Sequence, residues 1–568
     1  MGPEHIYVCG CGSVGAQLMI IGEAPSFAET AAGKPFVGPS GRELDRLLRE
    51  SGINRGDCWI TNVFKYEIPQ NPKGKFIPAW KRAASIGINV DEQLSELQAE
   101  INAIKPNCIL ALGKTALWAL SGRIEIGHYR GSIMSGMGRK FVATYHPAHL
   151  LHQATGGEFK GYYNRIVMIL DFKRALHQSS FPEINLPHRT LSVAQSSYHL
   201  KQFLDKYKGH KHPSIDIESL NCIPACIGIA FTPHEGMTIP LWNVNGISSI
   251  PDSDLIVCWQ ILAEFLSNHD VVGQNFNYDR DKLKRLGFIV RAIHSDTMLK
   301  AFTINPELPK NLGFNTSIYT EEPFYKDETM YGEYDKKKDK WNVDLNELFI
   351  GCARDAAVTK EIDIKMEKEL EEIGQREFYY NFVMKLPDFY QEMEHVGFGI
   401  DEDRRKELLE KYIKRDEQIR YELFKLTSEY VNCASPKQVK ELLFDKLKMP
   451  PRDGTGEEEL VSLLNLQSFK NEEHIKIIEL ILENRQVRKT IGTYVLALPD
   501  FDGRLRTSYF PCLDTGRSST SLQDPPIRPY VEVIDENGKK KKRSLGMAFQ
   551  TITKHSEVGH DIRSMLIP

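Results

Sequence analysis

Several acidic side chains in the middle of the chain have types and spacing suited to metal-dependent hydrolysis. Asp216 and Glu218 lie two apart in the β-branched run "HPSIDIESL", and because a strand has a period of two, both carboxylates are expected on one face. Asn275 and Asp279 lie four apart near the start of an expected helix and share a face. A further helix begins near Asp355. Taken alone, Asp-x-Glu is common, and a solvated strand edge is the alternative interpretation.

The order of these three features resembles the proofreading 3′–5′ exonuclease domain of DNA polymerases, which has an RNase H-like (DnaQ-like) fold. The resemblance implies that Asp216, Glu218, Asp279 and Asp355 bind two divalent ions, Mg²⁺ or Mn²⁺, and that Asn275 lies near the frayed 3′ end of DNA. Phosphodiester hydrolysis needs a hydroxide nucleophile and relief of charge on the leaving oxygen, which two such ions supply. Hard cations of this kind prefer carboxylate oxygens.

One position departs from that family. A tyrosine usually stands four residues before the last aspartate and orients the attacking water, but here the position is Gly351, in "FIGCARDAAVT". Another group, such as a tyrosine from elsewhere in the domain, would have to substitute.

The first part of the chain carries four further motifs. "LMIIGEAPSFAETAAGKPFVGPSGRELDRLLRESG" predicts a strand, a glycine turn, a loop and a helix that buries Leu44, Leu47 and Leu48. "WITNVFKY", "NCILALG" and "VATYHPAHLL" follow. Together they resemble the uracil-DNA glycosylase superfamily over about residues 15–170, which implies a three-layer α/β/α domain.

A glycosylase flips a base into a pocket, stacks it on an aromatic ring and reads its edge with an amide. The resemblance assigns stacking to Phe36 and reading to Asn62. It assigns stabilisation of the departing base to His146, and handling of the water to Glu29, with Glu23 nearby. Two interpretations stay open: an active glycosylase, and a base- or DNA-sensing module that kept the pocket.

The bacterial and archaeal type of this superfamily normally bears an iron–sulfur cluster held by four cysteine thiolates. Two of the expected positions are Tyr66 and Gln93 here, and only Cys9 and Cys11 lie nearby, in "CGCG". We therefore predict no iron–sulfur cluster.

The last third resembles the thumb of family A DNA polymerases and the start of the palm. "LPDFYQEMEHVGFGIDEDRRKELL" places Asp401 as the N-cap of a long helix, and "NCASPKQVKELLFDKL" predicts a capping box between Ser435 and Gln438. The resemblance implies that the thumb grips duplex DNA. "ILENRQVRKTIGTYVLAL" matches the next thumb helix, and "GRLRTSYFPCLDTGRSSTSLQDPP" resembles the segment that leads to the palm. The DNA-contacting residues implied by this resemblance are Ser435, Lys437, Arg485, Arg488, Lys489 and Arg517.

The sequence contains no match to the palm and fingers motifs that family A synthesis requires. The final stretch, "GMAFQTITKHSEVGHDIRSMLIP", resembles the segment before the first palm strand. We therefore expect a front portion of a phage-type (SPO1-like) polymerase, with polymerisation only if a second chain supplies the palm and fingers. A non-catalytic DNA-binding subunit of a split polymerase is the alternative. "DENGKKKKRS" predicts a solvated hairpin, with DNA contact by its lysines as the second interpretation.

Bulk properties fit a multidomain α/β protein. The chain has 568 residues, a net charge of −4 and ten scattered cysteines, which argue against a disulfide scaffold. No apolar run approaches the ~20 residues of a membrane span, so we expect a cytoplasmic protein that acts in the host cell if phage-encoded. The predicted divisions are a glycosylase-like domain over 1–178, a linker over 179–190, an exonuclease domain over 191–375, and the mainly helical thumb with truncated palm over 376–568.

Overall fold

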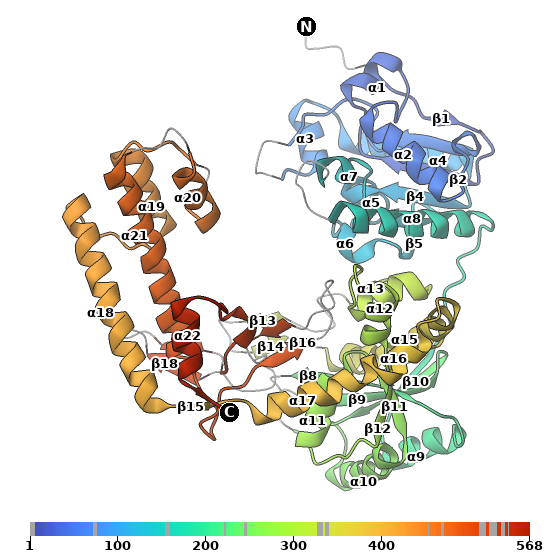
Figure 1. Ribbon diagram of the computed structural model, residues 1–568. Coiled ribbons are helices and arrows are strands. Elements are labelled where there is room, and N and C mark those ends of the chain that lie inside the picture. The colour runs from blue at the N-terminus through green and yellow to red at the C-terminus, as the bar shows by residue number, and fades with distance from the viewer. Residues whose placement is uncertain are drawn as a thin grey trace. The chain divides into compact units, whose positions relative to one another are not determined.

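The structure is a computed structural model, shown in Figure 1. It describes residues 6–71, 76–153, 160–220, 223–242, 247–326, 333–335, 340–342, 344–452, 454–466, 471–510, 519–521, 531–534, 540–543 and 545–568. The chain divides into two compact units, Met1–Met384 and Lys385–Pro568. Among the described residues, no helix is both long enough and apolar enough to cross a membrane.

The first unit contains a six-stranded sheet built from its N-terminal half, in the order β1-β3-β2-β4-β6-β5. The four central strands are parallel, and the two outer ones are antiparallel to their neighbours. The strands are β1 (Cys11–Gly12), β2 (Leu18–Gly22), β3 (Cys58–Asn62), β4 (Cys108–Leu112), β5 (Ile133–Gly136) and β6 (Arg139–Thr144).

Helices cover both faces of this sheet because its central strands are apolar on both sides, as parallel strands commonly are. One core joins the sheet to α2 (Pro39–Glu50) and α8 (Lys160–Ser179) and includes the predicted Leu44, Leu47 and Leu48. The other joins it to α4 (Val90–Ile104) and α5 (Gly113–Ser121). Short helices complete the region: α1 (Phe27–Ala32), α3 (Ala79–Ser85), α6 (Ile126–Tyr129) and α7 (Ala148–Gln153). The three-layer α/β/α arrangement agrees with the prediction.

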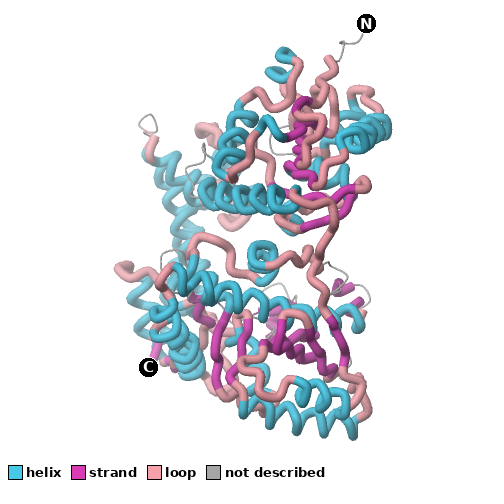
Figure 2. Tube along the Cα trace, turned by 90° about the vertical axis from the view of Figure 1, so that its right-hand side faces the viewer, coloured by secondary structure: helices cyan, strands magenta, loops and turns pink. Residues whose placement is uncertain are grey.

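A second six-stranded sheet follows in the same unit, in the order β12-β11-β8-β9-β10-β7. Its strands are β7 (Thr190–Val193), β8 (Ser214–Leu220), β9 (Ile223–Thr232), β10 (Glu235–Pro240), β11 (Asp270–Gly273) and β12 (Ala292–Asp296). The helices of this half are α9 (Ser197–Lys206), α10 (Asp252–Asn268), α11 (Phe276–Arg285), α12 (Thr297–Ile304), α13 (Leu312–Tyr319), α15 (Leu345–Glu372) and α16 (Arg376–Asn381). β13 (Glu333–Asp335) pairs with β14 (Lys340–Asn342). Figure 2 shows the strands as a layer with helices on either side.

The two faces of β8 have different partners. Ile215 and Ile217 join the apolar core shared with α9, α10 and α11. The opposite face packs against α15, where Gly228 of β9 and Gly236 of β10 permit close approach: an added Cβ would lie 2.5 Å and 2.4 Å from the carbonyl oxygens of α15. Two glycines therefore set how closely α15 lies on the sheet.

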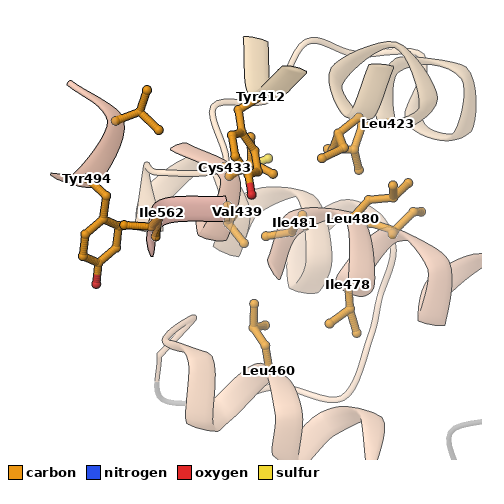
Figure 3. Close-up of a cluster of buried hydrophobic side chains, with 14 of the residues drawn as sticks. Tyr412, Leu423, Cys433, Val439, Leu460, Ile478, Leu480, Ile481, Tyr494 and Ile562 are labelled. Atoms are coloured by element: carbon orange, nitrogen blue, oxygen red, sulfur yellow. The ribbon is translucent and has the colours of Figure 1, made fainter. Parts of the chain in front are cut away.

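The second unit is mainly helical around one apolar core, part of which Figure 3 shows. Its elements are α17 (Leu386–Val396), α18 (Glu402–Thr427), α19 (Pro436–Lys440), a π-helical turn (Glu441–Lys446), α20 (Glu457–Leu464), α21 (Glu472–Lys489), a second π-helical turn (Thr490–Val495) and α22 (Glu557–Ser564). Short strands pair as β15 (Gly399–Ile400) with β20 (Leu566–Ile567), β16 (Ser508–Phe510) with β17 (Ser519–Ser521), and β18 (Val531–Ile534) with β19 (Lys540–Arg543).

Local predictions for this unit are mostly confirmed. Asp401 caps α18 by accepting from the backbone N–H of Arg404, and Ser435 caps α19. The capping-box prediction was wrong in one half, because the Gln438 side chain accepts from the backbone N–H of Asn432 rather than of Ser435. The predicted lysine hairpin is present as the β18–β19 ladder. Arg517 lies outside the described residues.

Candidate metal centre and a second pocket

Three carboxylates from two elements converge on the α15 face of the second sheet. Oxygens of Asp216 and Glu218, on β8, and of Asp355, on α15, all lie within 4.8 Å of one another. Asp355 is fully buried and the other two are partly buried. The prediction that a helix begins near Asp355 was wrong, because α15 begins at Leu345, capped by Asp344. We call this set of three carboxylates the acidic centre. Among the described residues, it is the one group of three or more side chains whose arrangement could hold a metal ion. Its all-oxygen donors fit Mg²⁺ or Mn²⁺.

Asp279, the fourth predicted ligand, is buried in the first turns of α11 and lies outside that tight set. Asn275 precedes the helix in the left-handed region, with φ of 55°. Asp296 holds this turn, because its carboxylate accepts from the backbone N–H groups of Asn275 at 3.0 Å and Phe276 at 2.8 Å. Sequence reasoning missed Asp296, whose role depends on a contact 21 residues away.

Burial and mutual repulsion shape the acidic centre. Burial raises the pKa of Asp216 well above its usual value, and the charges of Asp355, Glu218 and Asp279 add to this effect. Burial also raises the pKa of Asp279, with Glu218 contributing, against the opposing charge of Lys282. Asp279 therefore belongs to the same electrostatic cluster although it lies outside the tight set. Bringing cations to such a cluster removes the repulsion.

Two side chains that sequence reasoning did not identify bind Asp355. The Tyr325 hydroxyl donates to its Oδ1, and Lys326 Nζ lies 2.7 Å from its Oδ2. Although burial opposes it, the Asp355 carboxylate raises the pKa of Lys326 above its ordinary value. Both residues come from a loop whose described part, "EEPFYK", has no periodicity that would mark them.

In the first domain, the predicted pocket residues meet at the carboxyl ends of the parallel strands. Gly22 ends β2, and a Cβ there would lie 2.4 Å from Asn62 Oδ1 and 2.5 Å from the Phe36 ring, so both side chains lie against it. The rings of Phe36 and His146 stack with centroids 5.8 Å apart. This edge is where ligands bind in open α/β sheets.

Phe36 lies in the left-handed region, with φ of 55°, which is strained for a bulky residue. Glu29 supports it: Oε1 accepts from the Phe36 backbone N–H, and Oε2 accepts from that of Ser26 at 2.5 Å. Both carboxylate oxygens of Glu29 therefore have backbone donors. Glu23 is also engaged, with Arg82 at 2.6 Å and Thr115 at 2.5 Å.

The two expected cluster positions are occupied by packed side chains. The ring of Tyr66 lies edge-on to Tyr7 at 5.4 Å. Gln93 is buried, accepts from the backbone N–H of Lys65 at 2.7 Å and donates to Glu96 at 2.9 Å. Phenol and amide are not the thiolates that an iron–sulfur cluster needs, so these residues do not fit that group.

The predicted DNA contacts of the second unit differ in accessibility. Arg485 is engaged internally, donating to the carbonyls of Cys433 at 2.7 Å and Thr455 at 2.5 Å. Lys437 and Lys489 are exposed. Arg488 lines a pocket of about 330 Å³ together with Arg420, Leu423, Tyr430, Val431, Asn432, Cys433, Gln438 and Asn484.

Comparisons with known proteins identify the family of the first domain. The family model described as the uracil DNA glycosylase superfamily matches residues 9–168. The type-4 uracil-DNA glycosylase of Thermotoga maritima is 37% identical over 147 residues, covering 25% of this chain and 71% of that protein. That of Pyrobaculum aerophilum is 36% identical over 174 residues, covering 28% of this chain and 82% of that protein. The chain belongs to the uracil DNA glycosylase superfamily.

Behind this glycosylase-like domain, residues 402–568 match the model of DNA polymerase family A. DNA polymerase I of Borreliella burgdorferi is 28% identical over 373 residues, covering 64% of this chain and 39% of that protein. The chain thus spans well under half the length of this relative. It combines a uracil-DNA glycosylase-like domain with a family A polymerase domain homologous to DNA polymerase I.

Proposed function

We propose that this chain removes nucleotides from the 3′ end of DNA at the acidic centre, as the excision activity of a family A polymerase. The observation that carries the proposal is the convergence of Asp216, Glu218 and Asp355, within 4.8 Å of one another from two separate elements. The buried Asp279 carboxylate acts on the same cluster, and Asn275 is the N-cap of the helix that carries it. An all-carboxylate set suits phosphodiester hydrolysis better than acyl or redox chemistry.

In this proposal, divalent ions supply Lewis acidity and a hydroxide nucleophile when bound. The protein's own residues hold the reacting groups. β8 presents Asp216 and Glu218 on one face, and α15 brings Asp355 to them from above the sheet. Asn275, exposed at the N-cap of α11, is the candidate contact for the terminal nucleotide.

The test is release of mononucleotides from 5′-labelled single-stranded DNA in Mg²⁺ or Mn²⁺. We expect a ladder of products shortened from the 3′ end, abolished in the Asp216→Ala, Glu218→Ala double variant. A matched control is Asp205→Ala, Glu264→Ala, which removes two carboxylates elsewhere in the same half of the unit. Activity that survives in the double variant would show that the site is wrongly assigned.

We further propose that the second unit holds primer–template DNA as a polymerase thumb. The candidate phosphate contacts are the exposed Lys437 and Lys489, together with Arg488, which lines the pocket of about 330 Å³ described above. A non-catalytic DNA-binding subunit is the competing interpretation. Salt-sensitive DNA binding without nucleotide release would favour it.

A second candidate function is excision or sensing of a base in the glycosylase-like domain. Phe36 and Asn62 both lie against Gly22, and His146 stacks on the Phe36 ring, which favours this function. His146 Nδ1 accepts from the backbone N–H of Ala148 at 3.2 Å, which favours the tautomer with its ring proton on Nε2. Cleavage at abasic sites after incubation with uracil-containing DNA tests excision. Uracil-specific binding without cleavage would identify a sensor.

A further inference from the structure

The glycosylase-like domain holds the segment Glu322–Lys326 by its middle residue, Phe324. The backbone N–H of Phe324 donates to Ser132 Oγ at 3.0 Å. The Phe324 ring stacks on His128 at a centroid distance of 5.1 Å and lies edge-on to Tyr129 at 5.2 Å. It packs against the core that covers one face of the first sheet. Phe324 therefore belongs to the half of the first unit that carries the acidic centre but packs into the core of the glycosylase-like domain.

The next two residues reach the acidic centre. Tyr325 donates its hydroxyl to Asp355 Oδ1, and Lys326 Nζ lies 2.7 Å from Oδ2, so consecutive residues bind both oxygens of one carboxylate. The guanidinium of Arg354 lies over the Tyr325 ring, 4.9 Å from its centroid. The ring also packs against the apolar side of α15.

The start of the segment is tied to the sheet. Glu322 accepts from Arg189 Nε at 2.8 Å. Arg189 also donates to Glu361 of α15 at 2.6 Å, and only 3% of its side chain is exposed. The segment is thus fixed on both sides of Tyr325, and the tyrosine has little freedom to leave Asp355.

We propose that Tyr325 is a positioning residue for the acidic centre and that the glycosylase-like domain holds it in place through Phe324. This inference rests on the proposed exonuclease function. α15 carries Gly351, which has no side chain, one turn before Asp355. Tyr325 supplies a hydroxyl from the loop instead, and fixes the orientation of the Asp355 carboxylate. Loss of a group that orients a metal ligand typically lowers metal affinity or activity about 10- to 100-fold.

The first test compares Tyr325→Phe with Tyr319→Phe in the full chain. Tyr319 is a matched control because its hydroxyl donates at 2.7 Å to Glu369, another α15 carboxylate, outside the acidic centre. For Tyr325→Phe we expect kcat or Mn²⁺ affinity to fall about 10- to 100-fold, with the KM for DNA and the Tm unchanged. Mn²⁺ affinity is read from the electron paramagnetic resonance signal of the free ion.

The second test addresses the anchor. Phe324→Ala should lower kcat or Mn²⁺ affinity as much as Tyr325→Phe does. Phe324→Tyr, which keeps the ring, should retain the wild-type values. Trp118→Ala removes an aromatic side chain packed against the same core and should lower the Tm while leaving kcat and Mn²⁺ affinity unchanged.

The outcomes separate this inference from the function on which it rests. If Tyr325→Phe equals Tyr319→Phe in kcat and Mn²⁺ affinity while Asp216→Ala, Glu218→Ala is inactive, the positioning role is refuted and the exonuclease function stands. If Phe324→Ala keeps full kcat, the anchoring role of the glycosylase-like domain is refuted. A wild-type chain that releases no nucleotides refutes the proposed function, and the Mn²⁺ affinities of the two variants then still decide whether Tyr325 positions Asp355.

Discussion

Replacing Gly228 with alanine should damage the acidic centre without touching any of its residues. The added Cβ would lie 2.5 Å from the carbonyl oxygen of Cys352, about 0.9 Å short of the 3.4 Å at which ordinary contact begins. That oxygen belongs to the backbone of α15, three residues before Asp355, so relief requires the helix to withdraw from the sheet. Such overpacking costs about 1–3 kcal/mol of stability.

A withdrawal near 1 Å would separate Asp355 from Asp216 and Glu218, and misplacement of that size can reduce activity about 100-fold. The assay is nucleotide release from single-stranded DNA, with the free energy of unfolding measured in urea. Gly15→Ala is the control, because a Cβ at Gly15 meets nothing within 4 Å. Full activity in Gly228→Ala, at unchanged stability, would refute the view that close packing of α15 sets the geometry of the centre.

Three further predictions concern other parts of the chain. Burial lowers the pKa of His294 to about 4, with stacked His212 acting in the same direction, so the folded state binds fewer protons than the unfolded state between pH 4 and 6.5. Stability should therefore fall as the pH drops through that window. In urea unfolding measured across this range, His294→Gln should flatten the pH profile, whereas the exposed His199→Gln should not. Arg485→Ala should lower the free energy of unfolding by about 2 kcal/mol, because it leaves two carbonyls unpaired. Lys489→Ala, at an exposed residue, should leave the urea midpoint unchanged and reduce the salt dependence of DNA binding by about one ion. The reverse pattern would show that Arg485 contacts phosphate after all. Glu29→Gln should destabilise the turn at Phe36, because an amide accepts from only one of the two backbone N–H groups that bind Glu29. We expect both the Tm and the affinity for uracil-containing DNA to fall. A lower Tm with unchanged affinity would contradict the link between Glu29 and the position of Phe36.

Local sequence patterns predicted much of the fold. The period-two placement of Asp216 and Glu218 predicted their shared face, and the helical spacing of Leu44, Leu47 and Leu48 predicted a buried stripe; both are confirmed. These predictions succeeded because strand and helix periods determine which side chains share a face.

The rest depended on contacts between distant segments. Tyr325 reaches Asp355 from 30 residues away through a loop without periodicity. Arg485, expected on DNA from the resemblance to a polymerase thumb helix, donates instead to carbonyls 52 and 30 residues distant. Glu29, expected to handle water, supports a strained phenylalanine. Residue type indicated which groups are capable of chemistry, but the partner that each one takes was set by tertiary packing.

The measurement that tests the central claim most directly is Mn²⁺ binding to the full chain in the presence of a single-stranded oligonucleotide. The acidic centre predicts two bound ions per chain, with binding lost in Asp355→Asn and retained in Asp363→Asn, a buried aspartate on the same helix that pairs with Lys300. Binding that is absent in the wild type, or equal in both variants, would contradict the assignment of Asp216, Glu218 and Asp355 as a metal centre.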